Sequence, residues 1–134
     1  MDPKNIASSA RQPESATILV VDDERDIRDL LKRFLGEAGY RVLESPNGRD
    51  ALNQLRNTRV DLLISDIVMP EADGLEILQS LRNNFAGLKV IAMSGAFDGR
   101  FLRAAELLGA HATLLKPLSL SLVKETVARV LAAS

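Results

Sequence analysis

Apolar residues follow two alternating patterns along the chain from Thr17 onward. Short unbroken runs such as Ile18–Val21 are typical of strands that are buried on both faces of a sheet. Between these runs, apolar residues recur at intervals of three and four, as in Ile27, Leu31 and Phe34, which is typical of an amphipathic helix. The predicted strands are 17–21, 40–44, 60–66, 88–93 and 112–115, and a helix is predicted after each of them.

Residues that favour helix ends stand between the predicted elements. Asn47, Asp73 and Ser119 each precede a helical segment, where a side-chain oxygen can accept a free backbone amide of the first turn. Gly39 and Gly109 follow helical segments, at positions where a left-handed residue ends a helix. The chain is therefore predicted to consist of a strand and then a helix, five times over.

This order predicts the fold class. Parallel strands joined through helices form right-handed crossovers, which place helices on both faces of the sheet. We expect an α/β domain over 17–134 with a five-stranded parallel sheet. If the strand order is 2-1-3-4-5, as in flavodoxin-like (βα)5 folds, the first and third strands are neighbours where the order reverses. The second strand, 40–44, has mixed polarity and is expected at an edge. Residues 1–16 contain Pro3, Pro13 and three serines without periodicity, so a disordered N-terminal tail is predicted.

Composition and charge exclude several classes of protein. The 134 residues include no cysteine, which excludes disulfide scaffolds, thiolate zinc sites and cysteine nucleophiles. Lys and Arg number 17 against 18 for Asp and Glu, so the net charge of -1 gives no support for coating nucleic acid or a membrane surface. No apolar run approaches the roughly 20 residues that cross a bilayer, and the N-terminus lacks a secretory signal. We expect a cytoplasmic protein with no membrane insertion and no direct nucleic-acid contact.

Polar side chains stand at the ends of four predicted strands. Asp22 and Asp23 follow the first strand, Asp66 ends the third, Ser94 follows the fourth and Lys116 follows the fifth. Ligands of open α/β sheets bind outside the carboxyl ends of the strands, where the strand order reverses. With the order 2-1-3-4-5 the three aspartates would converge there, and the hydroxyl and the ammonium group would lie beside them.

The charge of this cluster predicts a bound cation. Three close carboxylates repel one another, and one lysine does not neutralise them. Oxygen ligands without His or Cys favour Mg²⁺, with Mn²⁺ as the alternative, over Zn²⁺. A divalent cation, a lysine and a hydroxyl together are typical of phosphoryl transfer. Because no His or Cys stands at this edge, a carboxylate would accept the phosphoryl group and form an aspartyl phosphate.

The same strand ends carry motifs of a known family. From Thr17 to the C-terminus the chain resembles the receiver domain of two-component response regulators, of the single-domain chemotaxis-regulator (CheY-like) type. Any one motif is weak evidence, but all of them in order, at strand ends, are specific. The matching stretches are ILVVDDE (18–24), SPNGRDAL (45–52), LLISDIVMPEADGLE (62–76), VIAMSGAF (90–97) and LLKPLS (114–119).

The resemblance implies a role for each residue of the cluster. Asp66 would accept the phosphoryl group from the phosphohistidine of a histidine kinase or a histidine phosphotransfer protein. Asp23 and Asp66, with the backbone carbonyl of Val68, would bind Mg²⁺, and Asp22 would act through metal-bound water. Lys116 would pair with the phosphoryl group. Such a domain is a phosphoacceptor that can dephosphorylate itself, and not a turnover enzyme.

The resemblance also implies a switch and a signalling surface. Ser94 would turn inward to hydrogen-bond the phosphoryl group. The surface of the fourth helix, fifth strand and fifth helix would then bind a downstream protein target, or a second copy in a homodimer. Apolar residues surround more of the predicted helix 98–108 than one buried face needs, which favours a partner surface over a broadly buried helix.

Two departures from the family pattern affect switching and dephosphorylation. The family often has an aromatic switch residue three positions before the lysine, where this chain has Thr113. Val68 and Ala96 flank the expected path of the hydrolytic water and cannot orient it by hydrogen bonding, so slow self-dephosphorylation is predicted. The Lys116–Pro117 peptide is expected to be cis, as is usual in the family.

Alternatives from other classes depend on features that this chain lacks. A phosphohydrolase of the haloacid-dehalogenase type would need an Asp-x-Asp pattern after the first strand and a substrate-capping insertion. A degenerate receiver used only as a scaffold is disfavoured because all the expected polar residues are present, and a receiver that serves as a phosphate sink stays an alternative. A nucleotide-binding Rossmann domain would need a G-x-G-x-x-G turn. Taken singly, Asp22, Ser94 and Lys116 are ordinary helix-start, turn and surface residues, so their joint placement carries the prediction.

Some questions stay open at this level. His111, the only histidine, stands at the start of the fifth strand and is expected on the surface, away from the aspartates. The sequence does not identify the cognate kinase, the pathway or the output target. It leaves open whether the chain is a complete single-domain regulator or part of a longer protein, and whether it is a monomer or a dimer.

Overall fold

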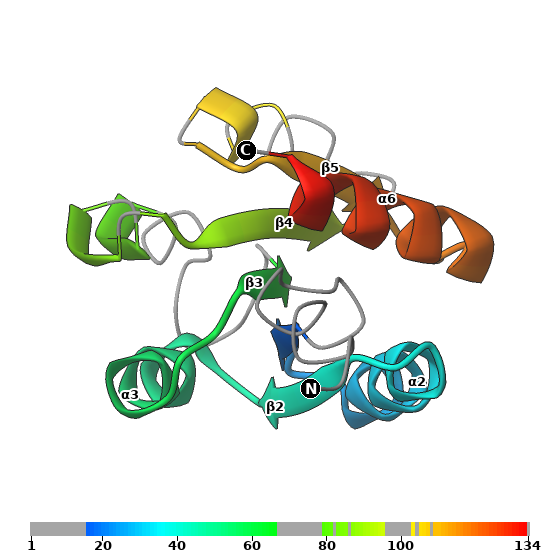
Figure 1. Ribbon diagram of the computed structural model, residues 1–134, viewed down its shortest axis with the longest axis horizontal. Helices are drawn as coiled ribbons and strands as arrows, with labels where there is room; N and C mark the ends of the chain where they lie inside the picture. The colour runs from blue at the N-terminus through cyan, green and yellow to red at the C-terminus, as the bar shows by residue number, and fades with distance from the viewer. Residues whose placement is uncertain are drawn as a thin grey trace, which may run out of the picture.

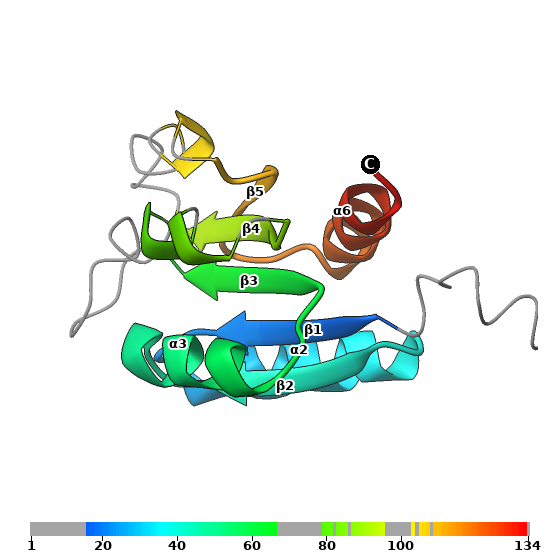
Figure 2. The same ribbon diagram turned by 60° about the vertical axis from the view of Figure 1, so that its left-hand side comes forward.

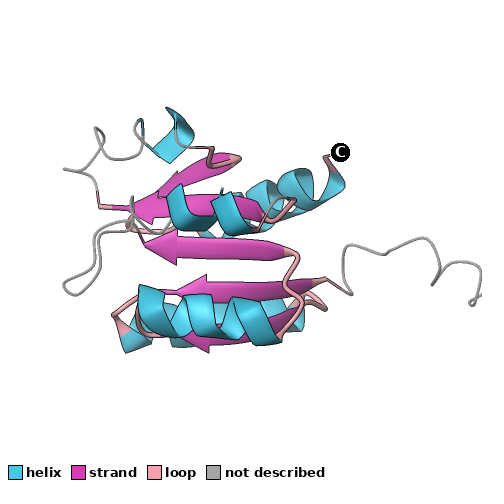
Figure 3. Cartoon of the chain, turned by 90° about the vertical axis from the view of Figure 1, so that its left-hand side faces the viewer, coloured by secondary structure: helices cyan, strands magenta, loops and turns pink. Residues whose placement is uncertain are grey.

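The computed structural model of the chain contains one sheet of five parallel strands, in the order β2-β1-β3-β4-β5. It describes residues 16–66, 79–81, 83–85, 87–95, 103, 105–107 and 109–133. The strands are β1 (Thr17–Val21), β2 (Arg41–Ser45), β3 (Leu62–Asp66), β4 (Lys89–Ser94) and β5 (Ala112–Leu115). Figure 3 shows the strand arrows pointing the same way. The predicted flavodoxin-like order is confirmed, with the mixed-polarity strand at an edge.

Helices cover both faces of this sheet (Figures 1 and 2). The helices with described ends are α2 (Arg25–Glu37), α3 (Gly48–Asn57) and α6 (Leu120–Ala132). Side chains alternate along β1, so that Ile18 and Val20 pack in the core with α2 and α6, while Leu19 and Val21 pack in the core with α3. Since both faces are covered, the inner strands bury every apolar residue, which explains their unbroken apolar runs.

Helix ends form at residues that the sequence indicates. The Asn47 side chain accepts a hydrogen bond from the Asp50 amide (2.8 Å) at the start of α3, and the Ser119 hydroxyl accepts one from the Leu122 amide (3.4 Å) at the start of α6. Gly39 follows α2 with φ of 102°, a left-handed conformation that glycine adopts without strain. These caps fix where each helix begins or ends relative to its neighbouring strand.

The start of β3 differs from the prediction by two residues, because the strand begins at Leu62 and not at Val60. Asp61 makes two contacts with Thr17 just before the strand begins. Its amide donates to the Thr17 carbonyl (2.9 Å), and its carboxylate accepts the Thr17 amide (2.8 Å). A side chain therefore occupies the place of a strand partner. The bounds of β2 and β4 each shift by one residue from the prediction.

Parts of the predicted helices lie outside the described residues. Helical conformation is described for 79–81 and 83–84, and for 105–107 within the predicted helix 98–108. Leu81 and Ala105 from these segments pack in the same core as α3. The predicted tail lies outside the described residues up to position 15, and Ala16 is buried in the core, so the domain boundary stays a prediction. The Lys116–Pro117 peptide is cis, as expected.

Candidate functional site

Three aspartates lie together at the carboxyl edge of the sheet, where β1 and β3 end. Asp66 is the last residue of β3, and Asp22 directly follows β1. The register of Val21 with Ser65 brings these two residues side by side. Asp22, Asp23 and Asp66 each offer a carboxylate oxygen within 4.8 Å of the others. Asp22 and Asp66 are buried and Asp23 is exposed, so the cluster opens to solvent on the side of Asp23.

Lys116 projects into this cluster from the residue after β5. Its ammonium nitrogen lies 2.8 Å from Asp22 Oδ2 and 3.1 Å from Asp66 Oδ2, and 3.8 Å from Glu24 Oε1. Its backbone amide donates to the Ser94 carbonyl (2.7 Å), which holds the strand end beside β4. The Lys116 ammonium group thus bridges the carboxylates of Asp22 and Asp66, which are 44 residues apart in the sequence.

Burial and mutual attraction determine the charge states of these groups. Burial is the main influence on Asp22 and raises the pKa of its carboxyl, while Lys116 and the Glu24 amide partly oppose this by bonding to the ionised form. Burial lowers the pKa of Lys116, but hydrogen bonds and charge from Asp22 and Asp66 outweigh it, so the pKa of that lysine lies above its usual value. Lys116 is therefore charged at neutral pH.

Ser94 ends β4, the neighbour of β3 in the sheet. Its side chain is fully buried, and among the buried side-chain polar atoms that the structure describes, its Oγ is the one without a hydrogen-bond partner. Leaving a buried hydroxyl unpaired costs about 1–3 kcal/mol, so the position indicates a partner oxygen supplied by a ligand. Thr113 lies half-buried in β5, in register with Ala92 of β4.

The loop between β1 and α2 is held by side chains on both sides. The Asp22 carboxylate accepts the Glu24 amide through Oδ1 (2.8 Å). Arg28, in the first turn of α2, donates from Nη1 to the Asp22 carbonyl (2.8 Å) and from Nε to Glu44 of β2 (3.0 Å). The Arg28 hydrogen bond holds the pKa of Glu44 below its usual value, with a further contribution from Lys32. Sequence reasoning missed Arg28, although a cation so near a helix N-terminus opposes the helix dipole and is itself a signal.

The donor set of the cluster fits a hard divalent cation. Among the described residues the candidate ligands are carboxylate oxygens of Asp22, Asp23 and Asp66, and the one ammonium group of the cluster pairs with two of these carboxylates. Oxygen ligands with excess negative charge suit Mg²⁺ or Mn²⁺. The unpaired Ser94 hydroxyl at the same edge suits an additional oxygen-bearing ligand.

Three other residues discussed from the sequence do not lie among the described residues of the cluster. Val68 and Ala96 lie outside the described residues. His111 is exposed at the start of β5, at the opposite edge of the sheet, and its Nδ1 accepts the Val90 amide (3.0 Å). The expectation that His111 is a surface residue away from the aspartates is confirmed.

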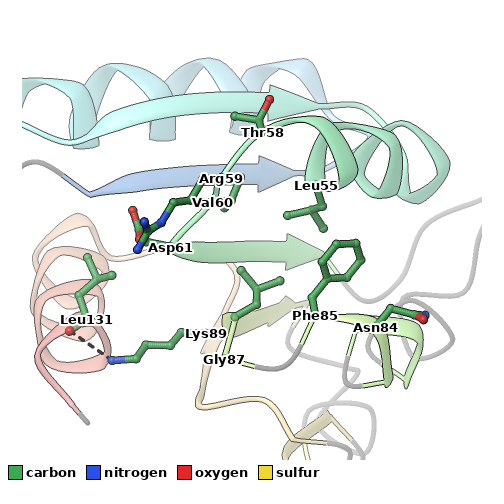
Figure 4. Close-up of a pocket in the computed structure, with 11 residues that line it drawn as sticks. Leu55, Thr58, Arg59, Val60, Asp61, Asn84, Phe85, Gly87, Lys89 and Leu131 are labelled. Carbon is green, nitrogen blue, oxygen red and sulfur yellow. Dashed lines mark hydrogen bonds and ion pairs between the residues drawn. The ribbon is translucent and has the colours of Figure 1, made fainter.

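A pocket of about 620 Å³ lies at this opposite edge, between α3, the start of β4 and the end of α6 (Figure 4). Leu55 and Phe85 contribute apolar lining, and Arg59 and Lys89 contribute positive charge. The Lys89 ammonium donates to the carbonyls of Val130 (2.9 Å), Leu131 (3.2 Å) and Ala133, and Arg59 lies 4.0 Å from Asp61. Both cations of this pocket already have protein partners, so we place the chemistry at the acidic edge.

Fold and cluster together define an α/β domain whose carboxyl edge suits a divalent cation and a phosphoryl group. Residues 18–128 match the family model of the response regulator receiver domain. The chain belongs to this family, and it is thus a receiver domain of two-component signal transduction. Domains of this family are phosphoacceptors and bind Mg²⁺ at an acidic pocket, which agrees with the aspartate cluster described above.

Relatives of the chain include regulators and kinases. The response regulator MprA of Mycolicibacterium vanbaalenii is 39% identical over 104 residues, which are 77% of this chain and 45% of that protein. The sensor kinase CckA of Brucella abortus is 35% identical over 130 residues, 96% of this chain and 14% of that protein. The structure of chemotaxis protein CheY4 of Vibrio cholerae has a TM-score of 0.80 and 29% identity, covering 87% of this chain and 98% of that one. This chain spans less than half the length of the curated relatives that it matches.

A search for membrane-spanning helices gives a negative result within the described part of the chain. There, no helix combines the length and the apolar character that crossing a bilayer requires.

Proposed function

We propose that this receiver domain is a phosphorylation-dependent switch that accepts a phosphoryl group on Asp66. The donor is the phosphohistidine of a histidine kinase or of a histidine phosphotransfer protein. One observation carries the proposal: the Lys116 ammonium contacts both Asp22 and Asp66, while Asp23 adds a third carboxylate beside them. A cation between carboxylates is suited to neutralise phosphoryl oxygens as they approach.

Burial and contacts favour Asp66 over its two neighbours as the acceptor. Asp22 is fully buried, and its two oxygens accept hydrogen bonds from the Glu24 amide and from Lys116. A carboxylate engaged in this way is a poor nucleophile, because attack would break contacts that stabilise its charge. Lys116 contacts Asp66, so the transferred group would arrive beside a cation, whereas the ion pairs of Lys116 do not include Asp23.

The transfer step exchanges one bond to phosphorus for another. A carboxylate oxygen of Asp66 attacks the phosphorus, and the oxygen–phosphorus bond forms as the phosphorus–nitrogen bond of the phosphohistidine breaks. The histidine nitrogen leaves with the bonding electron pair and takes up a proton from solvent. Lys116 pairs with a phosphoryl oxygen of the acyl phosphate, and the buried Ser94 hydroxyl donates a hydrogen bond to another.

The carboxylates also provide ligands for a cation. Asp23, Asp66 and the backbone carbonyl of Val68 would hold Mg²⁺, or Mn²⁺ as the alternative, and Asp22 would act through metal-bound water. Val68 lies outside the described residues. When bound, the cation supplies positive charge that offsets the carboxylates and the phosphoryl oxygens. The excess of carboxylates over ammonium groups in the cluster supports this assignment.

The phosphorylated state is read by a protein partner. Ser94 moves toward the phosphoryl group and shifts the chain after β4, with Thr113 in place of an aromatic switch residue. Large apolar side chains are exposed on the neighbouring elements: Leu107 (76%), Leu115 of β5 (52%) and Leu122 of α6 (49%). Their exposure supports a surface for a downstream protein target or for a second copy of the chain. The domain acts in the cytoplasm as a phosphoacceptor that dephosphorylates itself slowly, and not as a turnover enzyme.

Intact-mass measurement tests this proposal. The chain is incubated with acetyl phosphate in the presence of Mg²⁺ or of a chelator, in parallel with Asp66→Asn, which has nearly the same shape. We expect a gain of one phosphoryl group in the parent chain with Mg²⁺ and no gain in either control. Equal labelling of both proteins would move the acceptor elsewhere, and sustained release of phosphate from a small phosphoester would favour a phosphohydrolase.

A further inference from the structure

The three carboxylates of the acidic cluster are held in place in different ways. Side-chain contacts fix Asp22 and Asp66 through the Lys116 ammonium. The Asp23 carboxylate is exposed, and the described residues give it no hydrogen bond or ion pair. The position of Asp23 therefore depends on the backbone that carries it.

Arg28 holds that backbone directly. Its Nη1 donates to the Asp22 carbonyl at 2.8 Å. The Asp22 carbonyl and the Asp23 amide belong to one planar peptide group, so fixing the direction of the carbonyl also fixes the direction in which residue 23 leaves the sheet. The Arg28 side chain is only 13% exposed, which restricts its rotamers and makes the contact a rigid one.

Strand β2 anchors the other end of this contact. Arg28 Nε lies 3.0 Å from Glu44 Oε1, and the Asp22 amide donates to the Ser45 carbonyl (3.1 Å). Glu44 and Ser45 are consecutive residues of β2, so one strand supports the peptide group before Asp22 directly and the peptide group after it through Arg28. A guanidinium group suits this role because it donates in two fixed directions, whereas an ammonium group is a point charge.

We propose that Arg28 is a positioning residue for the cation site, because it orients the Asp22–Asp23 peptide so that the Asp23 carboxylate faces Asp66. This inference rests on the proposed Mg²⁺ binding. Arg28 shares the Glu44 carboxylate with Lys32, so its charge is not cancelled, and a lysine substitution is needed to separate geometry from charge. Lysine at position 28 would keep the charge but lose the two-directional contact.

Arg33 provides a matched control on the same helix. It also pairs with a glutamate, Glu37, at 3.9 Å, but its side chain is 84% exposed and lies in the middle of α2. Replacing Arg33 removes an arginine and an ion pair from α2 without touching the loop between β1 and α2.

Mg²⁺ titration of the full chain, followed by calorimetry or amide NMR shifts, tests the inference. The proteins compared are the parent, Arg28→Gln, Arg28→Lys, Arg33→Gln and Asp23→Asn. We expect about a tenfold loss of Mg²⁺ affinity in both Arg28 variants, the size typical for residues that orient metal ligands. Arg33→Gln is expected to bind Mg²⁺ like the parent, and Asp23→Asn to lose binding.

The outcomes separate this inference from the proposed function. If Arg28 only stabilises the fold, its variants will melt at lower temperature and bind Mg²⁺ with parental affinity once the folded fraction is taken into account. That result would overturn the positioning role and leave the proposed function intact. If the parent chain itself binds no Mg²⁺, both proposals fail. Should Arg28→Gln not fold, Arg28→Lys decides: parental affinity in that variant overturns the inference.

Discussion

The carboxyl and amino edges of the sheet each hold a half-buried lysine, but the two ammonium groups have different partners. Lys116, after β5, places its ammonium between Asp22 and Asp66 at the carboxyl edge. Lys89, at the start of β4, places its ammonium on the last carbonyls of α6 at the amino edge (Figure 4). Carbonyls at a helix C-terminus carry partial negative charge, and one lysine suits them. The negative charge of three carboxylates is larger than the positive charge of one lysine. The carboxyl edge therefore favours binding of a further cation, and the amino edge does not.

The two edges also differ in whether their polar side chains have partners within the protein. At the amino edge, the Asp61 carboxylate accepts the Thr17 amide and lies near Arg59. At the carboxyl edge, the buried Ser94 hydroxyl has no partner in the described part of the chain. Groups that are satisfied within the protein stabilise the fold, whereas unsatisfied buried groups indicate binding.

The largest expected effect comes from Lys116. Lys116→Met keeps the length of the side chain but removes the ammonium that would neutralise the phosphoryl oxygens. Loss of one such electrostatic contact slows acyl or phosphoryl chemistry by about 100-fold or more. The measurement is the initial rate of labelling by acetyl phosphate with Mg²⁺, followed by intact mass. An unchanged rate would remove Lys116 from the reaction.

The matched substitution at the other edge, Lys89→Met, is expected to affect stability alone. It removes the hydrogen bonds from Lys89 to the end of α6, which contribute about 1 kcal/mol. Urea unfolding followed by circular dichroism measures the loss, and the labelling rate should equal that of the parent. A labelling rate as low as that of Lys116→Met would break the distinction between the two edges.

Two serines on the adjacent strands β3 and β4 allow a paired hydroxyl to be compared with an unpaired one. Ser65 donates from Oγ to the Asp66 carbonyl (3.2 Å), while Ser94 has no such partner, and both are buried. Ser65→Ala should therefore lose about 1 kcal/mol of unfolding free energy, and Ser94→Ala should lose none or gain up to about 1 kcal/mol. Urea unfolding without Mg²⁺ compares the two. A larger loss in Ser94→Ala than in Ser65→Ala would show that the Ser94 hydroxyl is satisfied in the resting fold.

The smallest expected effect is a dependence of stability on pH at Glu44. The Arg28 hydrogen bond lowers the pKa of Glu44 from its usual value of 4.5, and Lys32 lowers it further. A carboxyl with a lowered folded pKa stabilises the protein above its unfolded pKa and loses that contribution as pH falls through the folded pKa. The stability difference between the parent and Glu44→Gln should thus shrink from pH 7 to pH 3. Equal differences at both pH values would contradict the ion pair.

Much of the fold and cluster could be predicted because both depend on local patterns. Unbroken apolar runs locate the inner strands, and Asp22, Asp66, Ser94 and Lys116 stand directly at strand ends. Parallel topology then brings those ends to one edge, whatever the details of packing. That these polar residues share one edge follows from these two facts, whereas the neighbourhood of the aspartates also needs the strand order β2-β1-β3-β4-β5.

Contacts that depend on tertiary packing could not be predicted in the same way. Arg28 and Glu44 meet because α2 packs beside β2, and Lys89 meets α6 because that helix ends beside the start of β4. Leu30 belongs to the apolar pattern of α2 yet is 40% exposed, because a pattern does not fix the width of the buried face. The later start of β3 likewise depends on one side-chain contact, from Asp61 to Thr17.

Chemical trapping of the acyl phosphate tests the central claim most directly. Borohydride reduces an aspartyl phosphate to homoserine at the same position, which peptide mass mapping locates. After phosphorylation with Mg²⁺, we expect homoserine at position 66 and at no other aspartate, and none when a chelator is present. Homoserine at Asp22 or Asp23, or a labelled protein without homoserine at position 66, would contradict the assignment of Asp66 as the phosphoacceptor.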